Sequence, residues 1–228
     1  PRVALLATGD ELVLPGAPAS PDQIVCSNPF GISALVTQAG GDPTFLGIAR
    51  DTRDDIAAKL SQAQTADIVV TIGGASVGDH DLVIPVLKDM GMQLDFWRIA
   101  MRPGMPFIFG QLGQQIVIGL PGNPVSSMIC SRIFLVPLIR RMLGLEDTDF
   151  AVEQLPLAAP LEANGIRQHY MRATLEIAPD GTRRVSPVGS QDSSLLAALA
   201  EASLLIVRPP EAGPEPVGAT VPVIHLDF

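Results

Sequence analysis

The stretch Ile68-Val69-Val70-Thr71-Ile72-Gly73-Gly74 decides the fold class of this chain. Its first five residues are all β-branched and predict a buried strand, and the two glycines predict the sharp turn that ends it. An apolar run at residues 3–7 ends in the same way before Thr8-Gly9, and residues 44–49 form a third such run. Helical patterns separate these strands. Strands that alternate with helices predict βαβ units and a mostly parallel sheet.

Local signals mark the helices between the strands. Asn28-Pro29 and Asn123-Pro124 each place a favourable N-cap residue before a proline that fits the first helical turn. Thr52, with Asp55 three residues later, resembles a capping box. From these signals and the apolar spacing we expect helices at residues 28–39, 52–60, 82–90 and 123–143, and further strands at residues 96–100, 107–109 and 116–118.

The chain changes in texture after Gly144. An acidic segment at residues 146–149 predicts a linker, and Asp180-Gly181 is typical of a β-hairpin turn. We expect strands at residues 154–161, 169–177, 183–187, 203–207 and 220–225 and one helix at residues 195–202. The sequence therefore predicts an α/β domain at residues 1–147 and a small β domain, a sandwich or a barrel, at residues 152–228.

The composition excludes several classes of protein. The 228 residues are 47% hydrophobic, and 15 basic residues face 24 acidic ones, for a net charge of −9. No segment approaches the roughly 18 uncharged apolar residues that cross a bilayer. An acidic chain is a poor binder of nucleic acid or anionic membranes. The two distant cysteines, Cys26 and Cys130, favour a reducing compartment. Because a strand begins almost at Pro1, we expect that the chain is cut from a longer protein.

Polar loops follow the predicted strands, so they should line the carboxyl edge of the sheet, where ligands bind in open α/β folds. The first loop, Thr8-Gly9-Asp10-Glu11, offers two adjacent carboxylates, which are suitable ligands for Mg²⁺. The alternative is a solvated turn in which Asp10 accepts hydrogen bonds from backbone N–H groups. Asp51 follows the strand at residues 44–49 and either joins the same site or caps the next helix.

The loop from Gly73 to Asp81 is more specific. Its three glycines let backbone N–H groups converge on an anion, Ser76 adds a donor, and Asp81 adds a metal ligand or a general base. The alternative is a loop that needs positive φ angles, which explains the glycines but not the serine and the paired acids. The glycines are Gly73, Gly74 and Gly78.

Two more segments fit an anionic ligand. Residues 119–126 lead from a strand into a helix, and free N–H groups at a helix start attract anions. The alternative there is a rigid turn, and the Lys-[Ser/Thr] pair of a P-loop is missing. Arg98 and Arg102 would share one face of an extended segment and clamp an anion. Alternatively, they pair with surface acids such as Asp89 and Asp95.

Six motifs occur together and in order, and their combination resembles the molybdopterin molybdenumtransferase family, which includes the bacterial MoeA proteins and the gephyrin E domain. The motifs are Thr8-Gly9-Asp10-Glu11-Leu12, Ser27-Asn28, Asp51, the loop from Gly73 to Asp81, Arg102-Pro103-Gly104-Met105-Pro106, and residues 119–126. The resemblance implies a three-layer α/β molybdopterin-binding domain followed by a small β-barrel-like domain. It also implies insertion of molybdate into adenylylated molybdopterin with release of AMP, assisted by Mg²⁺, in a cytoplasmic homodimer.

The resemblance also assigns roles by motif position. The expected catalytic residues are Asp51, Asp81, Arg98 and Arg102, and the expected metal ligands are Asp10, Glu11 and Asp81. The expected substrate-binding residues are Gly73, Gly74, Ser76, Gly78, Pro121, Gly122, Asn123 and Pro124. The family's Lys-Pro-Gly-Lys-Pro segment differs here, because Met105 replaces the second lysine. Family members also carry two further domains before this stretch.

Two other functions stay open. The related molybdopterin adenylyltransferase shares the fold, but its glycine loop reads Gly-Gly-Thr-Gly, and the attached β domain also argues against it. A molybdopterin-binding or scaffolding module without turnover is the non-enzymic alternative. The net charge of −9 does not conflict with a phosphate ligand, because Mg²⁺ bound to the acids at the edge would reverse the local sign.

Overall fold

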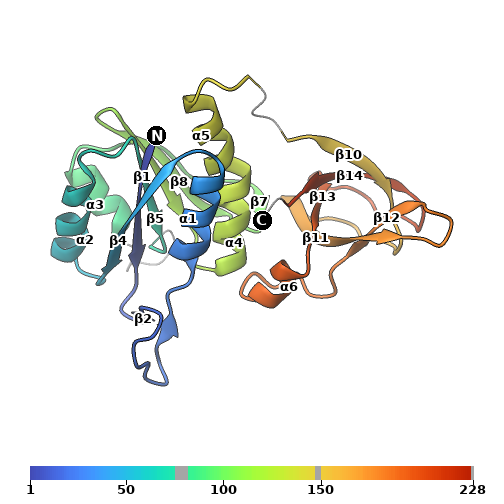
Figure 1. Ribbon diagram of the computed structural model, residues 1–228, viewed down its shortest axis with the longest axis horizontal. Coiled ribbons are helices and arrows are strands. Elements are labelled where there is room, and N and C mark those ends of the chain that lie inside the picture. Colours follow the sequence, from blue (N-terminus) through green and yellow to red (C-terminus); the bar gives the residue numbers. More distant parts are fainter. Residues whose placement is uncertain (75–81, 147–149, 227–228) are drawn as a thin grey trace. The chain divides into compact units, whose positions relative to one another are not determined.

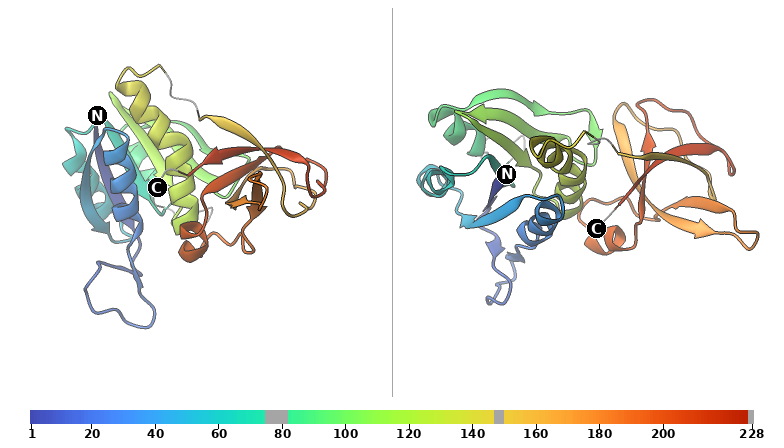
Figure 2. Two further views of the ribbon diagram at one scale, coloured as in Figure 1. Left: turned by 45° about the vertical axis from the view of Figure 1, so that its right-hand side comes forward. Right: turned by 45° about the horizontal axis from the view of Figure 1, so that its top comes forward.

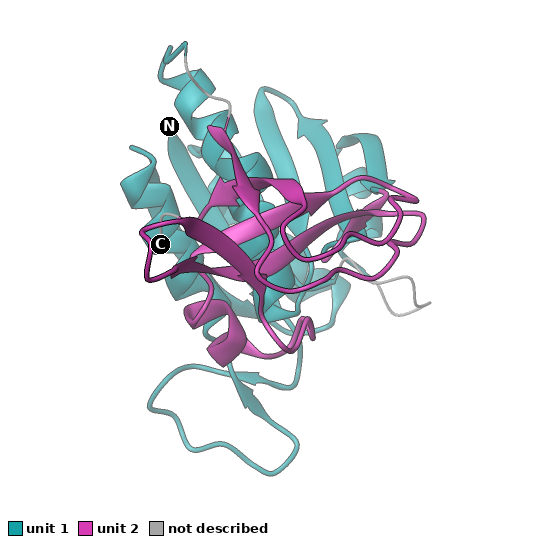
Figure 3. Cartoon of the chain, turned by 90° about the vertical axis from the view of Figure 1, so that its right-hand side faces the viewer, with its two compact units in different colours: residues 1–99, 104–148 teal, residues 100–103, 149–228 magenta. Residues whose placement is uncertain are grey.

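The structure is a computed structural model that describes residues 1–74, 82–146 and 150–226. The chain divides into two compact units (Figure 3). The first unit contains residues 1–99 and 104–148, and the second contains residues 100–103 and 149–228. We expected residues 100–103 in the first domain. They belong to the second unit because β7 (Met101–Arg102) pairs in parallel with β11 (Gln168–Ile177).

The first unit alternates strands and helices, as its sequence predicts. Its strands in the main sheet are β1 (Arg2–Thr8), β4 (Asp42–Ala49), β5 (Ile68–Ile72), β6 (Gln93–Arg98), β8 (Pro106–Leu112) and β9 (Gln115–Leu120). Its helices are α1 (Asn28–Gln38), α2 (Arg53–Leu60), the 3₁₀ turn η1 (Ser61–Ala63), α3 (Val83–Asp89), α4 (Pro124–Cys130), the π-helical turn η2 (Ser131–Leu135) and α5 (Val136–Met142).

The sheet of the first unit lies between two layers of helices, so the predicted three-layer α/β fold is confirmed. Its strand order is β4-β1-β5-β9-β8-β6, and the neighbours from β4 to β9 are parallel. α2 and α3 cover one face, and α1, α4 and α5 cover the other (Figures 1 and 2). Because β8 is antiparallel to both β9 and β6, the strand β6 ends at the same edge as the parallel strands.

Two of the differences from the sequence predictions concern the strand before residue 100 and the long helix. The strand expected at residues 96–100 ends at Arg98, where the chain leaves for the second unit. The long helix expected at residues 123–143 is present, but its middle turn at Ser131–Leu135 is π-helical. Pro137 sits in the first turn of α5, directly after this wide turn. Proline cannot donate a backbone hydrogen bond and clashes with the preceding helical turn, which explains the irregularity.

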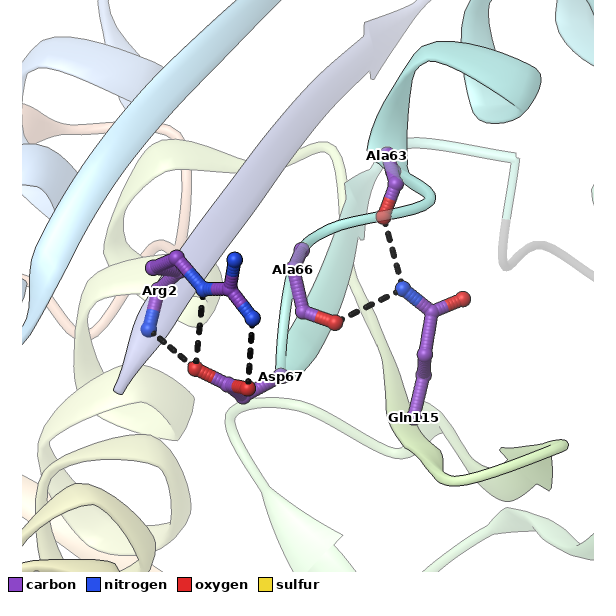
Figure 4. A network of polar contacts seen from close by, with 5 residues as sticks. All are labelled: Arg2, Ala63, Ala66, Asp67 and Gln115. Atoms are coloured by element: carbon purple, nitrogen blue, oxygen red, sulfur yellow. Dashed lines mark hydrogen bonds and ion pairs between the residues drawn. The ribbon is translucent and has the colours of Figure 1, made fainter.

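Polar contacts join the amino ends of β1, β5 and β9 on the far edge of the sheet (Figure 4). The backbone N–H and the guanidinium of Arg2 both donate to the carboxylate of Asp67, at 2.7 and 3.2 Å. These hydrogen bonds hold the pKa of Asp67 below its usual range. The side-chain amide of Gln115 donates to the carbonyl oxygens of Ala63 (2.6 Å) and Ala66 (2.8 Å). The polar groups of Arg2, Asp67 and Gln115 at this edge therefore have hydrogen-bond partners within the protein itself.

An excursion between β1 and α1 projects from the first unit (Figure 1). It contains two short strands, β2 (Leu12–Val13) and β3 (Ile24–Val25), which pair in parallel. Its apolar side chains are largely exposed, including Leu14 and Ile24. Apart from this excursion, the core of the unit follows the predicted apolar runs, and the five residues of β5 are all buried.

The second unit is built on one twisted sheet with a short helix. Besides β7 and β11, its strands are β10 (Val152–Pro156), β12 (Arg183–Pro187), β13 (Leu204–Arg208) and β14 (Thr220–His225), and its helix is α6 (Leu196–Ala200). The strand order is β10-β14-β13-β11-β12. An isolated parallel bridge between Leu157 and Val185 joins the two ends of this order. Within residues 150–226 the sheet is thus barrel-like without a continuous ladder between β10 and β12, and β10 ends earlier than expected.

None of the helices in the described part of the chain is long and apolar enough to cross a membrane. Both cysteines are buried and free. Burial raises the pKa of the Cys130 thiol above its usual range, and burial together with the charge of Glu11 raises the pKa of Cys26 to about 11. Neither thiol is therefore a reactive nucleophile at neutral pH.

Candidate active site

The predicted site residues that the structure describes in the first unit lie where strands of its sheet end. Asp10 follows β1, Asp51 follows β4, Gly73 follows β5, Pro121 follows β9, and Arg98 is the last residue of β6. All five strands end at one edge of the sheet, so the topology gathers these residues as expected. Ser76, Gly78 and Asp81 lie outside the described residues.

Asp10 and Asp51 meet at the ends of β1 and β4. The backbone N–H of Asp51 donates to Oδ1 of Asp10 at 3.2 Å, and the N–H of Gly9 donates to the carbonyl of Ala49 at 3.2 Å. A β-bulge at residues 46–47 precedes this point and shifts the register between the two strands. The Asp10 carboxylate thus accepts a backbone hydrogen bond, and it also stands beside a second acid.

Glu11 turns back onto its own loop. A Cβ atom built on Gly9, whose φ is 148°, would lie 2.6 Å from Oε2 of Glu11, so this carboxylate covers the glycine backbone. The charge of Glu11 contributes to the raised pKa of Cys26, which agrees with that position. Within residues 1–74, 82–146 and 150–226, no group of three or more Asp, Glu, His or Cys side chains could hold a metal ion. The contact between Asp10 and Asp51 joins the Asp10 carboxylate to the backbone of Asp51.

Asp51 does not cap the helix that follows it. Thr52 is the N-cap of α2, and its hydroxyl accepts from the N–H of Asp55 at 3.3 Å. The carboxylate of Asp55 accepts in turn from the N–H of Arg50 at 2.7 Å. The predicted cap by Thr52 is confirmed, whereas the Asp55 carboxylate accepts from Arg50, two residues before the N-cap, and not from the N–H of Thr52 as in a regular capping box. The alternative that Asp51 caps this helix is therefore wrong, because Thr52 is the capping residue.

The glycine turn after β5 is sterically required. Gly73 and Gly74 have φ angles of 90° and 61°. A Cβ on Gly73 would lie 2.8 Å from the carbonyl oxygen of Thr8, and one on Gly74 would lie 2.4 Å from Cγ2 of Val83. The N–H of Gly73 donates to the carbonyl of Leu120 at 3.0 Å, so it is not available to an anion. The alternative of a turn that needs positive φ thus explains Gly73 and Gly74 without a ligand.

The turn after β9 lies beside the glycine turn. A Cβ on Gly122 would lie 3.6 Å from Cα of Gly73. The side-chain amide of Asn28 donates to the carbonyl of Gly122 at 2.7 Å, across 94 positions of sequence. Asn28 was expected to cap α1, but Ser27 is the N-cap residue, and Asn28 instead fixes the turn of Pro121, Gly122, Asn123 and Pro124. The extended backbone of Asn123 precedes α4.

Arg98 and Arg102 do not share one extended segment, which corrects the sequence interpretation. Arg98 ends β6 in the first unit, whereas Arg102 is in β7 of the second unit. The guanidinium of Arg98 lies 4.1 Å from the ring centroid of Trp97. Asp89 pairs with Arg53, and among the described residues Arg98 forms no ion pair. The alternative of surface pairing with Asp89 or Asp95 is therefore not realised for Arg98.

A cavity of about 630 Å³ opens at the ends of β1 and β4. It is lined by Gly9, Asp10, Leu12, Gln23, Ile48, Arg50 and Thr52. The sequence analysis did not select Gln23 or Arg50. Arg50 stands directly before Asp51 at a strand end, which was the one signal that could have found it. Gln23 comes from the excursion between β1 and α1, where no periodic pattern marks it.

The second unit contains a group of basic residues, of which the sequence analysis selected only Arg102. His169 on β11 is opposite Arg102 on β7 and Arg208 on β13. Burial, and then the charges of Arg102, Arg167, Arg172 and Arg208, lower the pKa of His169 to about 4. Arg172 is fully buried and donates to the carbonyl oxygens of Ser190, Asp192 and Leu195. We call His169 with these four arginines the arginine cluster.

Together, these features define an open α/β ligand-binding domain with acids and glycine turns at its carboxyl edge, joined to a small β domain. Residues 4–141 match the family described as probable molybdopterin binding domain, and the chain belongs to that family. Residues 154–226 match the family described as the MoeA C-terminal region, domain IV. The resemblance noted from the six motifs is thereby confirmed.

Several relatives extend over nearly the whole chain. A molybdopterin molybdenumtransferase of Nostoc sp. is 36% identical over 92% of this chain and 49% of the relative. One of Haemophilus influenzae is 34% identical over 99% of this chain and 57% of the relative. The crystal structure of the molybdopterin biosynthesis MoeA protein from Pyrococcus horikosii has a TM-score of 0.84 and 28% identity, over 99% of this chain and 54% of that chain. The chain spans about half the length of these relatives.

Proposed function

We propose that this chain forms the catalytic part of a molybdopterin molybdenumtransferase, which inserts molybdate into adenylylated molybdopterin and releases AMP. The supporting observation is the meeting of Asp10 and Asp51 beside the turns of Gly73 and Gly122 at the carboxyl edge of the sheet. Relatives named molybdopterin molybdenumtransferase match both units of the chain. The adenylyltransferase alternative is disfavoured because the second unit matches a region of MoeA proteins.

The acids fit a divalent cation. Mg²⁺ is usually held by one or two carboxylates together with water and substrate phosphates, and Asp10 and Asp51 offer that number of carboxylates. When bound, Mg²⁺ would neutralise charge on the substrate phosphates. Asp10 and Asp51 would hold the cation or orient the attacking water, and Asp81 is proposed to assist them. Glu11, which covers Gly9, is proposed to contribute negative charge from the next position.

The anionic groups of the substrate need positive partners. We assign this role to Arg98 and Arg102, and to the backbone of the turn at residues 121–124. A guanidinium binds phosphate or an oxoanion through several N–H donors, which a single backbone amide cannot match. We further propose that the chain acts as a homodimer in the cytoplasm.

The test follows AMP release by the 228-residue chain and, as a positive control, by the Haemophilus influenzae relative, each supplied with adenylylated molybdopterin, Mg²⁺ and molybdate. We expect AMP release that requires molybdate. Asp10→Asn retains the Oδ1 that accepts from Asp51 but removes the charge, so it should lower turnover by about a hundredfold or more without unfolding.

Asp180→Asn is the matched control, because Asp180 also accepts a backbone hydrogen bond, from Thr182, in a hairpin of the second unit. It should leave turnover unchanged. If the substrate binds to this chain and no AMP appears, while the relative releases AMP under the same conditions, the function is that of a binding module. If AMP release does not depend on the charge of Asp10, the metal role assigned to this residue is wrong.

A further inference from the structure

Arg98 and Trp97 form a contact that the proposed function does not explain. The guanidinium carbon of Arg98 lies 4.1 Å from the centroid of the Trp97 ring, within the range of a cation–π interaction. Both side chains are exposed, and the Trp97 residue is 38% accessible. No described residue accepts a hydrogen bond from Arg98 or forms an ion pair with it. The ring is therefore the one recorded partner of this guanidinium among the described residues.

The strand that carries both residues is firmly anchored. β6 is the end strand of its sheet, and its Phe96 stacks on Phe109 at 5.4 Å and on Phe107 at 6.2 Å. Phe107 is buried and contacts Phe134 of the helical layer at 4.6 Å. These ring contacts fix the backbone immediately before Trp97. The ring of Trp97 is thus presented from a rigid support at the carboxyl edge.

The ladder between β6 and β8 is irregular beside Trp97 and Arg98. Phe96 pairs with Phe109 and Arg98 pairs with Pro106, so β8 spans one residue more than β6 over this interval. In a regular strand, side chains at successive positions point to opposite faces. The extra residue lies in β8, opposite the interval of β6 that contains Trp97, so the regular alternation of the ladder is interrupted beside the Arg98–Trp97 contact.

A free arginine side chain samples many rotamers in water and loses this freedom when it binds a ligand. A contact with an aromatic face restricts the side chain before the ligand arrives, and affinity rises when that restriction matches the bound conformation. Five N–H donors of the guanidinium remain for an anion. Arginine is suited to this arrangement because its planar, weakly hydrated cation both stacks on rings and binds oxoanions.

We propose that Trp97 is a positioning residue, which holds Arg98 ready to receive an oxygen of the phosphate or oxoanion substrate. The proposal rests on the anion-binding role of Arg98 in the proposed function, and it adds the residue that prepares Arg98 for that role. Trp97 acts through Arg98 and makes no contact with the reacting atoms. Its effect should therefore vanish when Arg98 is absent.

A double-mutant cycle on the 228-residue chain tests the coupling. Isothermal titration with sodium molybdate, and separately with AMP in the presence of Mg²⁺, gives the dissociation constants for the parent chain, Trp97→Leu, Arg98→Leu and the double variant. An exposed cation–π contact corresponds to about a two- to fivefold effect on binding. We expect that weakening from Trp97→Leu in the parent chain, and no weakening from the same change in the Arg98→Leu background.

Two further variants separate positioning from structure. Trp97→Tyr keeps an aromatic face and should restore most of the affinity that Trp97→Leu loses. Phe30→Leu removes an exposed aromatic side chain from α1, where Phe30 contacts Phe45, and should leave binding unchanged. Trp97 is also the single tryptophan of the chain, so its fluorescence should change on anion binding and should lose that response in Arg98→Leu.

The outcomes are distinguishable. If the parent chain binds an anion, Arg98→Leu weakens that binding and Trp97→Leu does not, the positioning role is wrong while the proposed function stands. Equal weakening by Trp97→Leu with and without Arg98 would show that the tryptophan acts on the fold rather than on Arg98. If the parent chain binds neither molybdate nor AMP, the anion site of the proposed function fails, and the inference fails with it.

Discussion

In the second unit, the guanidinium of Arg172 is fully buried and donates to three backbone carbonyl oxygens, whereas in the first unit the guanidinium of Arg98 is exposed and forms no ion pair with a described residue. The hydroxyls at the ends of β1 and β5 continue this contrast. The side chains of Thr8 and Thr71 are buried, yet neither hydroxyl has a hydrogen-bond partner in the described part of the chain.

The difference separates groups that stabilise a fold from groups that are available to a ligand. Buried donors that meet their acceptors hold loops together, and their removal leaves carbonyl groups without partners. Donors that lack partners contribute little to folding and are tolerated where another molecule can complete them. The arginine cluster belongs largely to the first kind, and the carboxyl edge of the first sheet belongs to the second.

Arg208→Met should give the largest effect on stability. It tests most directly whether buried arginines stabilise the fold while exposed ones do not. Arg208 is buried, and its guanidinium donates to the carbonyl oxygens of Glu162, Ala212 and Gly213. Hydrogen bonds from a charged donor to buried acceptors are worth about 1.5–3 kcal/mol each, so we expect a loss of about 3 kcal/mol or more. Urea denaturation followed by circular dichroism measures it.

The matched control is Arg102→Met, which removes an exposed guanidinium from β7, a strand that pairs with β11 as the strand of Arg208 does. This change should alter the free energy of unfolding by less than about 0.5 kcal/mol. Equal losses from the two variants would mean that burial and carbonyl contacts do not separate structural arginines from available ones.

Much of the first unit could be predicted from local sequence. Residues 68–72 form a strand with the bounds that the β-branched run indicates, and Thr52 caps the next helix by accepting from Asp55 as expected. Such features depend on neighbours within a few positions, which a single sequence displays. The strand β7 depends on pairing with β11, more than 60 positions away, and its two residues stand in a proline- and glycine-rich stretch without strand periodicity.

The candidate site was predictable to the extent that chain topology decides it. Asp10 and Asp51 meet because parallel strands end at one edge, whereas the distant contact of Asn28 with Gly122 has no local signal. The buried arginines could not be predicted at all. Charged residues are expected on the surface, and the acceptors of Arg172 are backbone carbonyl groups that any sequence possesses.

His169→Gln should give an intermediate effect, confined to acid pH. The pKa of His169 is about 4 in the folded chain, against 6.5 for the free side chain, because burial and four arginines oppose its charge. Between these values the unfolded chain binds more protons, so acidification from pH 6.5 to 4 should remove as much as about 3 kcal/mol of stability. The side chain of Gln does not bind a proton in this pH range. The His169→Gln variant should therefore lose less stability on acidification than the parent chain.

Urea denaturation at a series of pH values from 7 to 4 measures this difference. The carboxylates titrate in both proteins, so the contribution of His169 is the difference between the two curves. Curves that remain parallel would mean that His169 is protonated as easily in the folded chain as in the unfolded chain. Burial and the four arginine charges would then oppose the protonation of His169 less than the structure indicates.

Thr8→Val gives the smallest expected change in the free energy of unfolding. It is nevertheless a stringent test, because we expect the substitution to stabilise the chain, whereas most substitutions destabilise. Valine matches threonine in shape but lacks the hydroxyl, and a buried hydroxyl without a partner costs about 1 kcal/mol or more. The variant should therefore be more stable than the parent chain by about 1 kcal/mol. Thr52→Val, at the end of the adjacent strand, removes an N-cap hydroxyl that accepts from Asp55 and should lose about 1 kcal/mol.

If Thr8→Val raises the free energy of unfolding and Thr52→Val lowers it, the hydroxyl at the end of β1 lacks a hydrogen-bond partner, whereas the hydroxyl after β4 has one. Urea denaturation of both variants under one condition measures the pair. If Thr8→Val destabilises the chain as Thr52→Val does, the Thr8 hydroxyl has a partner in solution, such as a buried water. The polar group at the end of β1 would then have a hydrogen-bond partner, as the buried arginines of the arginine cluster do. The contrast between the two regions would rest on Arg98 alone.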